Sequence, residues 1–166
     1  MTSLAEAAAE ADALAQAGDE KALARLRAQW DDELEGAARA ADYRVRAQAY
    51  RAIAQFRFRQ KLELLRRGLE DESPAARGSA LIALEALSRR HPGDVNAYRG
   101  LLHELAAHDP NVAVRRLAVI CLKNGSPQRD TIQLLEGIAE SEDLNHELRK
   151  TARVVGAGLR KKAVAK

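Results

Sequence analysis

Apolar residues recur along this chain at intervals of three and four positions, the spacing that places them on one face of an α-helix. Gly, Pro or a capping residue separates most of these stripes, and no window alternates Val, Ile and Thr with polar residues as a strand would. The pattern therefore predicts an all-α fold. We expect nine helices, which begin near residues 3, 19, 42, 58, 73, 94, 109, 126 and 143.

One motif within these helices occurs four times. An arginine is followed three positions later by alanine, with a small or apolar residue one position before it and another seven positions after it. These positions share one side of a helix, and the arginines lie 31, 38 and 34 residues apart, which leaves room for one more helix per unit. We therefore expect four stacked hairpins with each alanine buried between units. The repeated pairs are Arg46 and Ala49, Arg77 and Ala80, Arg115 and Ala118, and Arg149 and Ala152.

The first helix is expected to act as a cap. Ser3 and Glu6 have the spacing of a capping box, and Gly18 is a helix-terminating residue. The helix has no pairing partner of its own, so we assign residues 1–18 to an N-terminal capping helix that covers the first hairpin. Residues 19–160 then form the repeat domain, and residues 161–166 form a basic tail.

Capping residues set other expected helix starts. Asp109-Pro110, Ser73-Pro74 and Ser126-Pro127 each offer a capping side chain followed by a proline suited to the first helical position. Asp19 and Asp94 are expected to cap two further helices.

The segment from residue 42 to residue 67 contains neither Pro nor Gly and could form one long helix. Its first apolar stripe, which includes Val45, Ile53 and Phe56, does not continue in phase beyond that point. We therefore place a turn at residues 57–60 and expect Val45 to face inward.

Four segments carry a resemblance to a known family. Val45-Arg46, the leucines at 62, 65 and 69, and Asp71-x-x-Pro74-x-x-Arg77 resemble one period of the HEAT repeats, specifically the short bacterial kind related to phycobilisome-lyase repeats. Asp109-Pro110-x-Val112-x-Val114-Arg115 is similar to the most recognisable segment of that family. The resemblance covers roughly residues 19–159. It implies a right-handed α-solenoid, or superhelix, whose second helices line a concave surface that binds partners.

The repeated arginines have two interpretations. The HEAT resemblance implies that they bond to acids and carbonyls of neighbouring turns and so stabilise the stack. The alternative is a ladder of guanidinium groups that face a ligand. Because the position recurs in every unit, we favour the architectural role and do not assign these arginines to a site.

Length and composition fit one cytoplasmic domain. A chain of 166 residues can bury a sizeable core, and its aromatic content of 4% leaves alanine to pack the helices closely. The first 18 residues carry Glu6, Glu10 and Asp12 but no base, unlike a secretory signal. No apolar run approaches the roughly 20 residues that span a bilayer, so we expect no membrane association. The single cysteine, Cys121, is interpreted as a buried residue in a reducing compartment.

Charge is distributed in blocks along the chain. Residues 1–42 carry a net charge of −6, residues 43–67 carry +7, residues 68–147 carry −5 and residues 148–166 carry +7. The first basic block interleaves arginines with aromatic residues, an arrangement that can give salt-sensitive affinity for nucleic acid. A solvated surface is the alternative explanation. The candidate residues for binding a partner or nucleic acid are Arg44, Arg51, Arg57, Arg59, Arg116, Lys123, Lys150 and Arg153.

No motif in the sequence predicts catalysis, a metal or a cofactor. His103 and His108 resemble a zinc-protease helix motif but are five positions apart, about 140° around a helix, so they cannot share a metal ion. The sequence has no glycine-rich phosphate loop and no Cys/His set with zinc spacing. We therefore expect a protein that is not an enzyme.

The sequence favours a non-catalytic scaffold that is a monomer and binds a protein partner through its concave face. The alternative is a DNA-binding protein that uses the basic segments 43–67 and 148–166. A third function, an accessory subunit of a lyase or a DNA-repair activity, rests on family analogy alone.

Overall fold

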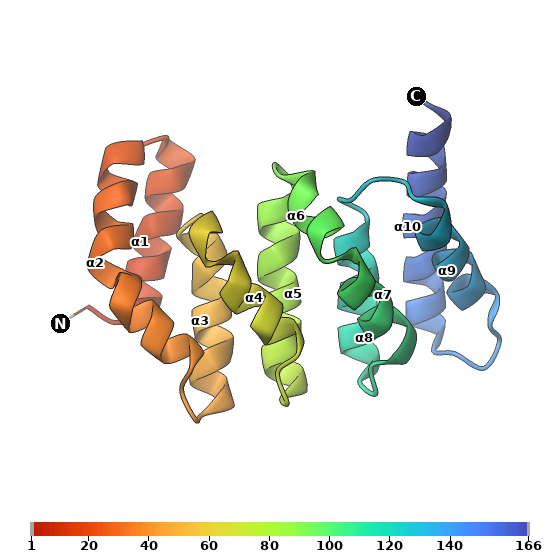
Figure 1. Ribbon diagram of the computed structural model, residues 1–166, viewed down its shortest axis with the longest axis horizontal. Helices are drawn as coiled ribbons and strands as arrows, with labels where there is room; N and C mark the ends of the chain where they lie inside the picture. Colours follow the sequence, from red (N-terminus) through yellow and green to blue (C-terminus); the bar gives the residue numbers. More distant parts are fainter. Residues whose placement is uncertain (1, 166) are drawn as a thin grey trace. The chain divides into compact units, whose positions relative to one another are not determined.

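The computed structural model describes residues 2–165, and over that range the chain is helical with no strand (Figure 1). The chain divides into two compact units, the first ending at Leu87 and the second beginning at Ser88. No helix in the described range is both long enough and apolar enough to span a bilayer.

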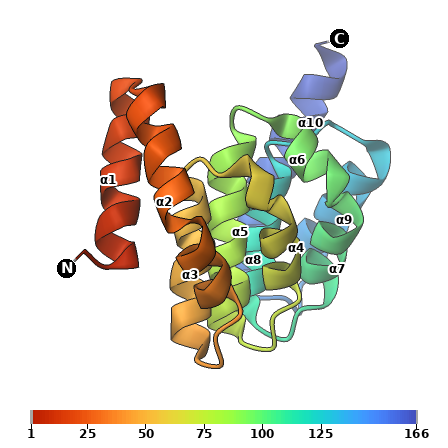
Figure 2. The ribbon, with the colours of Figure 1, turned by 60° about the vertical axis from the view of Figure 1, so that its left-hand side comes forward.

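In the first unit, α1 packs against both α2 and α3 (Figure 2). It therefore covers the α2–α3 hairpin, as expected for a capping helix. The elements of this unit are α1 (Leu4–Ala17), α2 (Glu20–Ala38), α3 (Tyr43–Gln55), the 3-10 helix η1 (Arg59–Lys61), α4 (Leu62–Leu69) and α5 (Pro74–Ser88).

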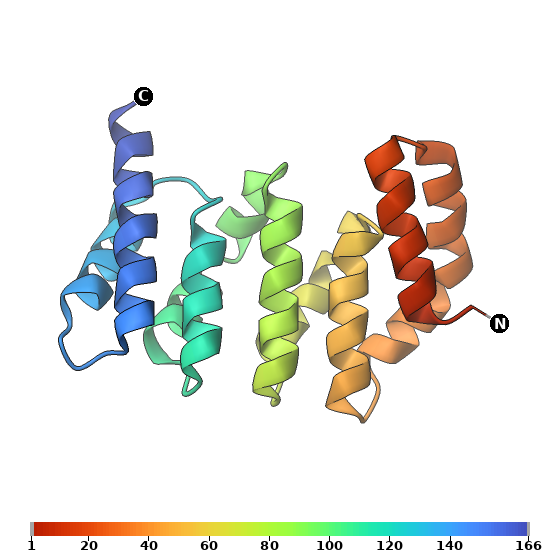
Figure 3. The ribbon, with the colours of Figure 1, turned by 180° about the vertical axis from the view of Figure 1, so that it is seen from behind.

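In the second unit, α7 pairs with α8 and α9 pairs with α10, while α8 and α10 lie side by side (Figure 3). Neighbouring hairpins thus place their second helices next to each other. The elements are α6 (Pro92–Ala97), α7 (Arg99–His108), α8 (Val112–Leu122), α9 (Arg129–Glu140) and α10 (His146–Val164).

The predicted helix caps at the N-terminal end are confirmed. The backbone N–H of Glu6 donates to Ser3 Oγ at 3.2 Å, and the N–H of Ala22 donates to Asp19 Oδ1 at 3.1 Å. Gly18 ends α1 with a φ of 74°, a left-handed conformation that costs glycine little. These capping residues determine where α1 begins and ends and where α2 begins.

The repeat register is confirmed by burial and by capping. All four repeat alanines, Ala49, Ala80, Ala118 and Ala152, have 0% exposed surface. The N-cap residue of each second helix also lies four positions before the repeat arginine. These caps are Asp42, Ser73, Asn111 and Asn145, and each side chain accepts a backbone N–H from the first turn.

Three expected helix starts, near residues 109, 126 and 143, are wrong, because α8, α9 and α10 begin at Val112, Arg129 and His146. Asn111 rather than Asp109 caps α8, and Asp109 Oδ1 instead accepts the N–H of Asn111 at 2.9 Å, which shapes the turn before the helix. Pro110 therefore precedes the helix. In the same way α9 begins at Arg129, after an extended Gln128, so Ser126-Pro127 belongs to the loop.

The expected helix from residue 94 is two helices. Its first part, α6, begins at Pro92, so Asp94 lies inside the first turn and does not cap it. A break at Tyr98, whose ψ of 16° departs from the helical value, separates α6 from α7. The described residues therefore form ten α-helices rather than nine.

Two further segments differ from expectation. Val45 is 38% exposed, whereas its equivalents Ala76, Val114 and Leu148 in the other second helices are buried. At the other end of the chain, α10 continues through Gly156 and Gly158 as far as Val164, so residues 161–164 are helical. Residue 166 of the expected tail lies outside the described range.

Candidate partner-binding surface

All four repeat arginines donate to backbone carbonyls in the last turn of the preceding helix or in the turn that follows it. Arg46 Nη1 reaches the carbonyls of Ala40 and Ala41 at 2.9 and 2.8 Å, and Arg77 Nη1 reaches that of Asp71 at 2.8 Å. In the second unit, Arg115 Nε donates to the carbonyl of Ala106 at 2.9 Å and Arg149 Nε donates to that of Ala139 at 3.4 Å. Ala106 and Ala139 lie in the last turns of α7 and α9, so Arg115 and Arg149 act as C-terminal caps, whereas Arg46 and Arg77 bond to the turns that follow α2 and α4.

Arg46 also forms a two-point ion pair with Asp71 of the next repeat. Its Nε lies 2.8 Å from Asp71 Oδ2 and its Nη2 lies 2.9 Å from Oδ1. Burial by itself would raise the pKa of the Asp71 carboxyl, but the bond to Arg46, the N–H of Ser73 and the charge of Arg46 together lower it. The same bond raises the pKa of Arg46. Arg46 is therefore an architectural residue.

Two candidate arginines of the first basic block are held by internal contacts. Arg44 donates to both oxygens of the Asp42 carboxylate at 3.2 Å, next to the cap of α3. Arg57 donates from Nη1 to Asp12 at 2.8 Å and to the carbonyls of Ala54 and Gln55 at 2.9 and 3.1 Å. Arg57 caps the C-terminal end of α3 and links α3 to α1 through Asp12. Its guanidinium group is therefore paired within the first unit.

Lys61 in the same block lies between two acids of α2. Its Nζ is 2.6 Å from Asp31 Oδ1 and 2.9 Å from Glu35 Oε1, and the side chain is only 15% exposed. The hydrogen bond from Lys61 lowers the pKa of Glu35. Sequence reasoning missed this cluster, because the acids precede the lysine by more than 20 residues and no motif links them.

The remaining candidates of the block are Arg51 and Arg59, and both side chains are exposed. Arg51 has no hydrogen-bond or ion-pair partner within residues 2–165. Arg59 lies in η1 and interacts with other groups of the protein. The aromatic residues between them are core residues, with Phe56 at 0% and Phe58 at 7% exposure. The first basic block therefore exposes far fewer unpaired cations than its net charge of +7 in the sequence indicates.

The other four candidate residues converge on the side-by-side helices α8 and α10. Arg116 Nε donates to Thr151 Oγ1 at 2.9 Å, which places Arg116 next to the first turns of α10. Lys150 and Arg153 are exposed on α10, and Arg153 Nη2 contacts the carbonyl of Ala139 at the end of α9 at 3.4 Å. Lys123 is exposed at the end of α8, where its carbonyl accepts from Lys162 Nζ at 2.7 Å.

Exposed apolar side chains accompany these cations. Val112 in the first turn of α8 is 42% exposed, and Val154 on α10 is 66% exposed. We call the surface of Val112, Arg116, Lys150 and Val154 the α8–α10 face. It combines guanidinium and ammonium groups with uncovered apolar surface, a composition that favours contact with a protein.

The histidine and cysteine side chains show other roles. His103 Nε2 lies 2.8 Å from Thr131 Oγ1, and burial lowers the pKa of His103. Cys121 is buried in α8. Within residues 2–165 no three His, Cys, Asp or Glu side chains gather as metal ligands would.

Residues 34–103 match the family model for HEAT repeats. The matched segment covers the end of α2, all of α3 to α6 and part of α7. Together with the all-helical architecture, this match supports a HEAT-repeat assignment and fits an α-solenoid. A comparison with curated proteins found no significant match.

Proposed function

We propose that this chain is a non-catalytic HEAT-repeat scaffold that binds an acidic protein partner through the α8–α10 face. HEAT repeats commonly serve as protein-interaction scaffolds, which supports the general class. The observation that carries the proposal is the exposure of Val112 and Val154 on the two adjacent second helices that also carry the exposed Arg116 and Lys150. In the right-handed superhelix that we propose, of about four hairpins of the phycobilisome-lyase type, second helices line the concave side.

The chemistry of this face favours a protein over a nucleic acid. Nucleic-acid surfaces combine many free cations with exposed aromatic side chains on which bases stack. Here Arg57 and Lys61 bond to acids of α1 and α2, and Arg44 pairs with Asp42 at the surface. Of the four aromatic residues in the first basic block, only Tyr43 is exposed, at 46%. An apolar patch flanked by cations instead suits an acidic, amphipathic helix or strand of a partner protein. The proposed location is the cytoplasm, where a buried thiol such as Cys121 stays reduced.

The proposal is tested by affinity capture at high salt followed by a charge-reversal variant. Immobilised wild-type protein should retain a specific partner in high salt, because apolar contact resists screening. The Arg116→Glu/Lys150→Glu variant should lose that partner. Glu33→Lys/Glu104→Lys, which alters exposed residues of α2 and α7, is the control and should retain it.

Binding of duplex DNA is the contrasting outcome. An affinity for DNA that falls steeply between low and physiological salt and is lost in Arg44→Glu/Arg51→Glu would favour the nucleic-acid alternative. Capture that survives Arg116→Glu/Lys150→Glu would place the binding surface elsewhere and contradict the proposal.

A further inference from the structure

The outward side of α10 lacks the cover that the other second helices have. Four positions after the repeat arginine, the first three second helices carry Tyr50, Leu81 and Val119, which are 3%, 0% and 0% exposed. The equivalent residue of α10 is Arg153, which is exposed. This side of α10 is thus the face that, in the repeat register, a neighbouring helix would cover, and no helix within residues 2–165 of the chain covers it.

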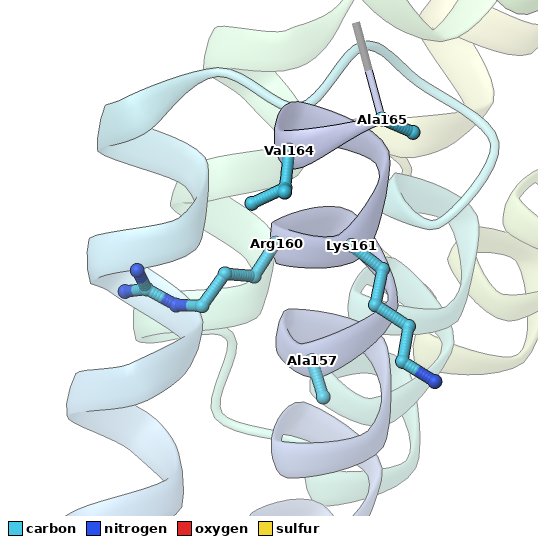
Figure 4. Close-up of a pocket in the computed structure, with 5 residues that line it drawn as sticks. All are labelled: Ala157, Arg160, Lys161, Val164 and Ala165. Carbon is cyan, nitrogen blue, oxygen red and sulfur yellow. The ribbon is translucent and has the colours of Figure 1, made fainter.

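This face is apolar along its centre and basic at its edges. A shallow pocket on the C-terminal half of α10 is lined by Ala157, Arg160, Lys161, Val164 and Ala165 (Figure 4). Val164 is 83% exposed, and Lys161 has no hydrogen-bond or ion-pair partner in the described chain. Arg160 instead pairs with Glu136 of α9. We call the surface of Arg153, Ala157, Lys161 and Val164 the terminal face of α10.

The outward side of α1 is complementary to this face in charge and carries small side chains. Glu6, Ala9, Glu10 and Ala13 are all exposed, while the opposite side of α1 is buried against α2 and α3. The first base of the chain is Lys21, so α1 carries only acidic charge. Alanines at i and i+4 make its surface shallow enough for an approaching helix with a protruding valine.

We propose that copies of this chain associate head to tail, with the terminal face of α10 in one copy bound to the outward face of α1 in the next. Lys161 and Arg153 would then lie against Glu6 and Glu10, and Val164 and Ala157 against Ala9 and Ala13. The occupant is a second copy because its own α1 supplies the charge and the small side chains that this basic, apolar surface fits. This departs from the monomer expected from the sequence.

The proposed contact buries a small area, so we expect weak association. One helix face against another buries less than about 1,200 Å² in total, which is typical of weak complexes. The two surfaces differ, so the contact is heterologous, and each added copy leaves one face of each kind open. Association should therefore appear at high protein concentration, extend beyond dimers and weaken with salt.

Sedimentation velocity from micromolar to millimolar protein tests the proposal. The Glu6→Lys/Glu10→Lys and Arg153→Glu/Lys161→Glu variants should each associate roughly tenfold more weakly than wild type, because attraction becomes repulsion. A chain with all four changes should recover association, because the charges are complementary again. Arg116→Glu, which changes α8 and leaves α10 intact, is the control and should associate like wild type, which separates this contact from the proposed partner surface.

Circular dichroism and thermal unfolding establish that each variant is folded. All the changed side chains are exposed, and the only bonds they lose within the described chain are those of Arg116 to Thr151 and of Arg153 to the Ala139 carbonyl. The helical signal should therefore match that of wild type, and the midpoint should shift little. The proposal is overturned if wild type remains a monomer at millimolar concentration or if both charge-reversal variants associate as strongly as wild type. It is also overturned if the folded chain with all four changes fails to associate.

Discussion

Arg46 and Asp71 form a two-point ion pair across consecutive repeats, with only 12% and 6% of their side chains exposed. Asp71 also accepts the N–H of Ser73 at 2.9 Å and the hydroxyl of Tyr50 at 3.2 Å. One carboxylate therefore joins the start of α3, its second turn and the turn before α5. Breaking such a pair leaves a buried charge without its partner, which costs more than the loss of an exposed pair.

The first prediction is that Asp71→Asn lowers the free energy of unfolding by about 2 kcal/mol, because Arg46 keeps its carbonyl acceptors but loses its counter-charge. Urea unfolding followed by circular dichroism measures this change. Glu72→Gln is the control, since Glu72 is 91% exposed and 3.9 Å from Arg46. It should shift the free energy by less than about 0.5 kcal/mol. Equal effects of the two changes would contradict the role of Asp71.

The second prediction concerns pH. The pKa of Asp71 in the folded protein is lower than its ordinary value of 3.8, so the carboxylate stabilises the fold fully above that value. This stabilisation is lost as the pH falls through the lower, folded-state pKa. The difference in unfolding free energy between wild type and Asp71→Asn should stay constant from about pH 7 to pH 5 and shrink below about pH 4.

Urea unfolding of both proteins at a series of pH values provides the measurement. Other acids titrate equally in the two proteins, so the difference isolates Asp71. A difference that grows as the medium becomes more acidic would have the wrong sign and would exclude the ion pair as its source.

Much of the fold could be predicted because it repeats. The arginine and alanine positions recur in each second helix, and the structure confirms both the buried alanines and the carbonyl-capping role of the arginines. Helix starts were less predictable. Asp109-Pro110 and Ser73-Pro74 resemble each other, but the N-cap is the residue four positions before the arginine, and only the second pair has its cap there.

The candidate site was harder to predict because charge counted along the chain differs from charge free at the surface. Residues 43–67 sum to +7, yet Lys61 is held by Asp31 and Glu35 and Arg57 by Asp12. Those acids come from α1 and α2. Sequence gives the sign of a side chain, whereas packing of distant helices decides whether it is neutralised.

The third prediction concerns Arg57, which has a φ of 52° in the turn after α3. The N–H of Phe58 donates to the carbonyl of Ile53 at 2.9 Å and the N–H of Arg57 to that of Ala54 at 3.0 Å, a helix-ending pattern that usually has glycine at this place. Both Arg57→Gly and Arg57→Ala lose the guanidinium contacts. Glycine should be the better replacement by about 1 kcal/mol, because it alone adopts this φ without strain.

Thermal unfolding of the two Arg57 variants measures this difference. A matched pair at Arg51, an exposed position within α3, should show the opposite order, because alanine favours a helix interior over glycine by about 1 kcal/mol. If alanine is also the better residue at position 57, the backbone there is not left-handed in solution.

The fourth prediction uses two helical glycines with opposite surroundings. A Cβ at Gly68 of α4 would lie 2.8 Å from Ala80 Cβ and 3.0 Å from the Tyr50 ring, whereas one at Gly137 of α9 would meet nothing within 4 Å. Alanine favours a helix over glycine by up to about 1 kcal/mol, so Gly137→Ala should stabilise the protein. Gly68→Ala should destabilise it by about 1 to 3 kcal/mol, because neither neighbour can move aside without opening the core between α3, α4 and α5.

Chemical unfolding of both variants measures the change in the free energy of unfolding and its sign. Stabilisation by Gly68→Ala would mean that these helices do not approach as closely as the structure shows.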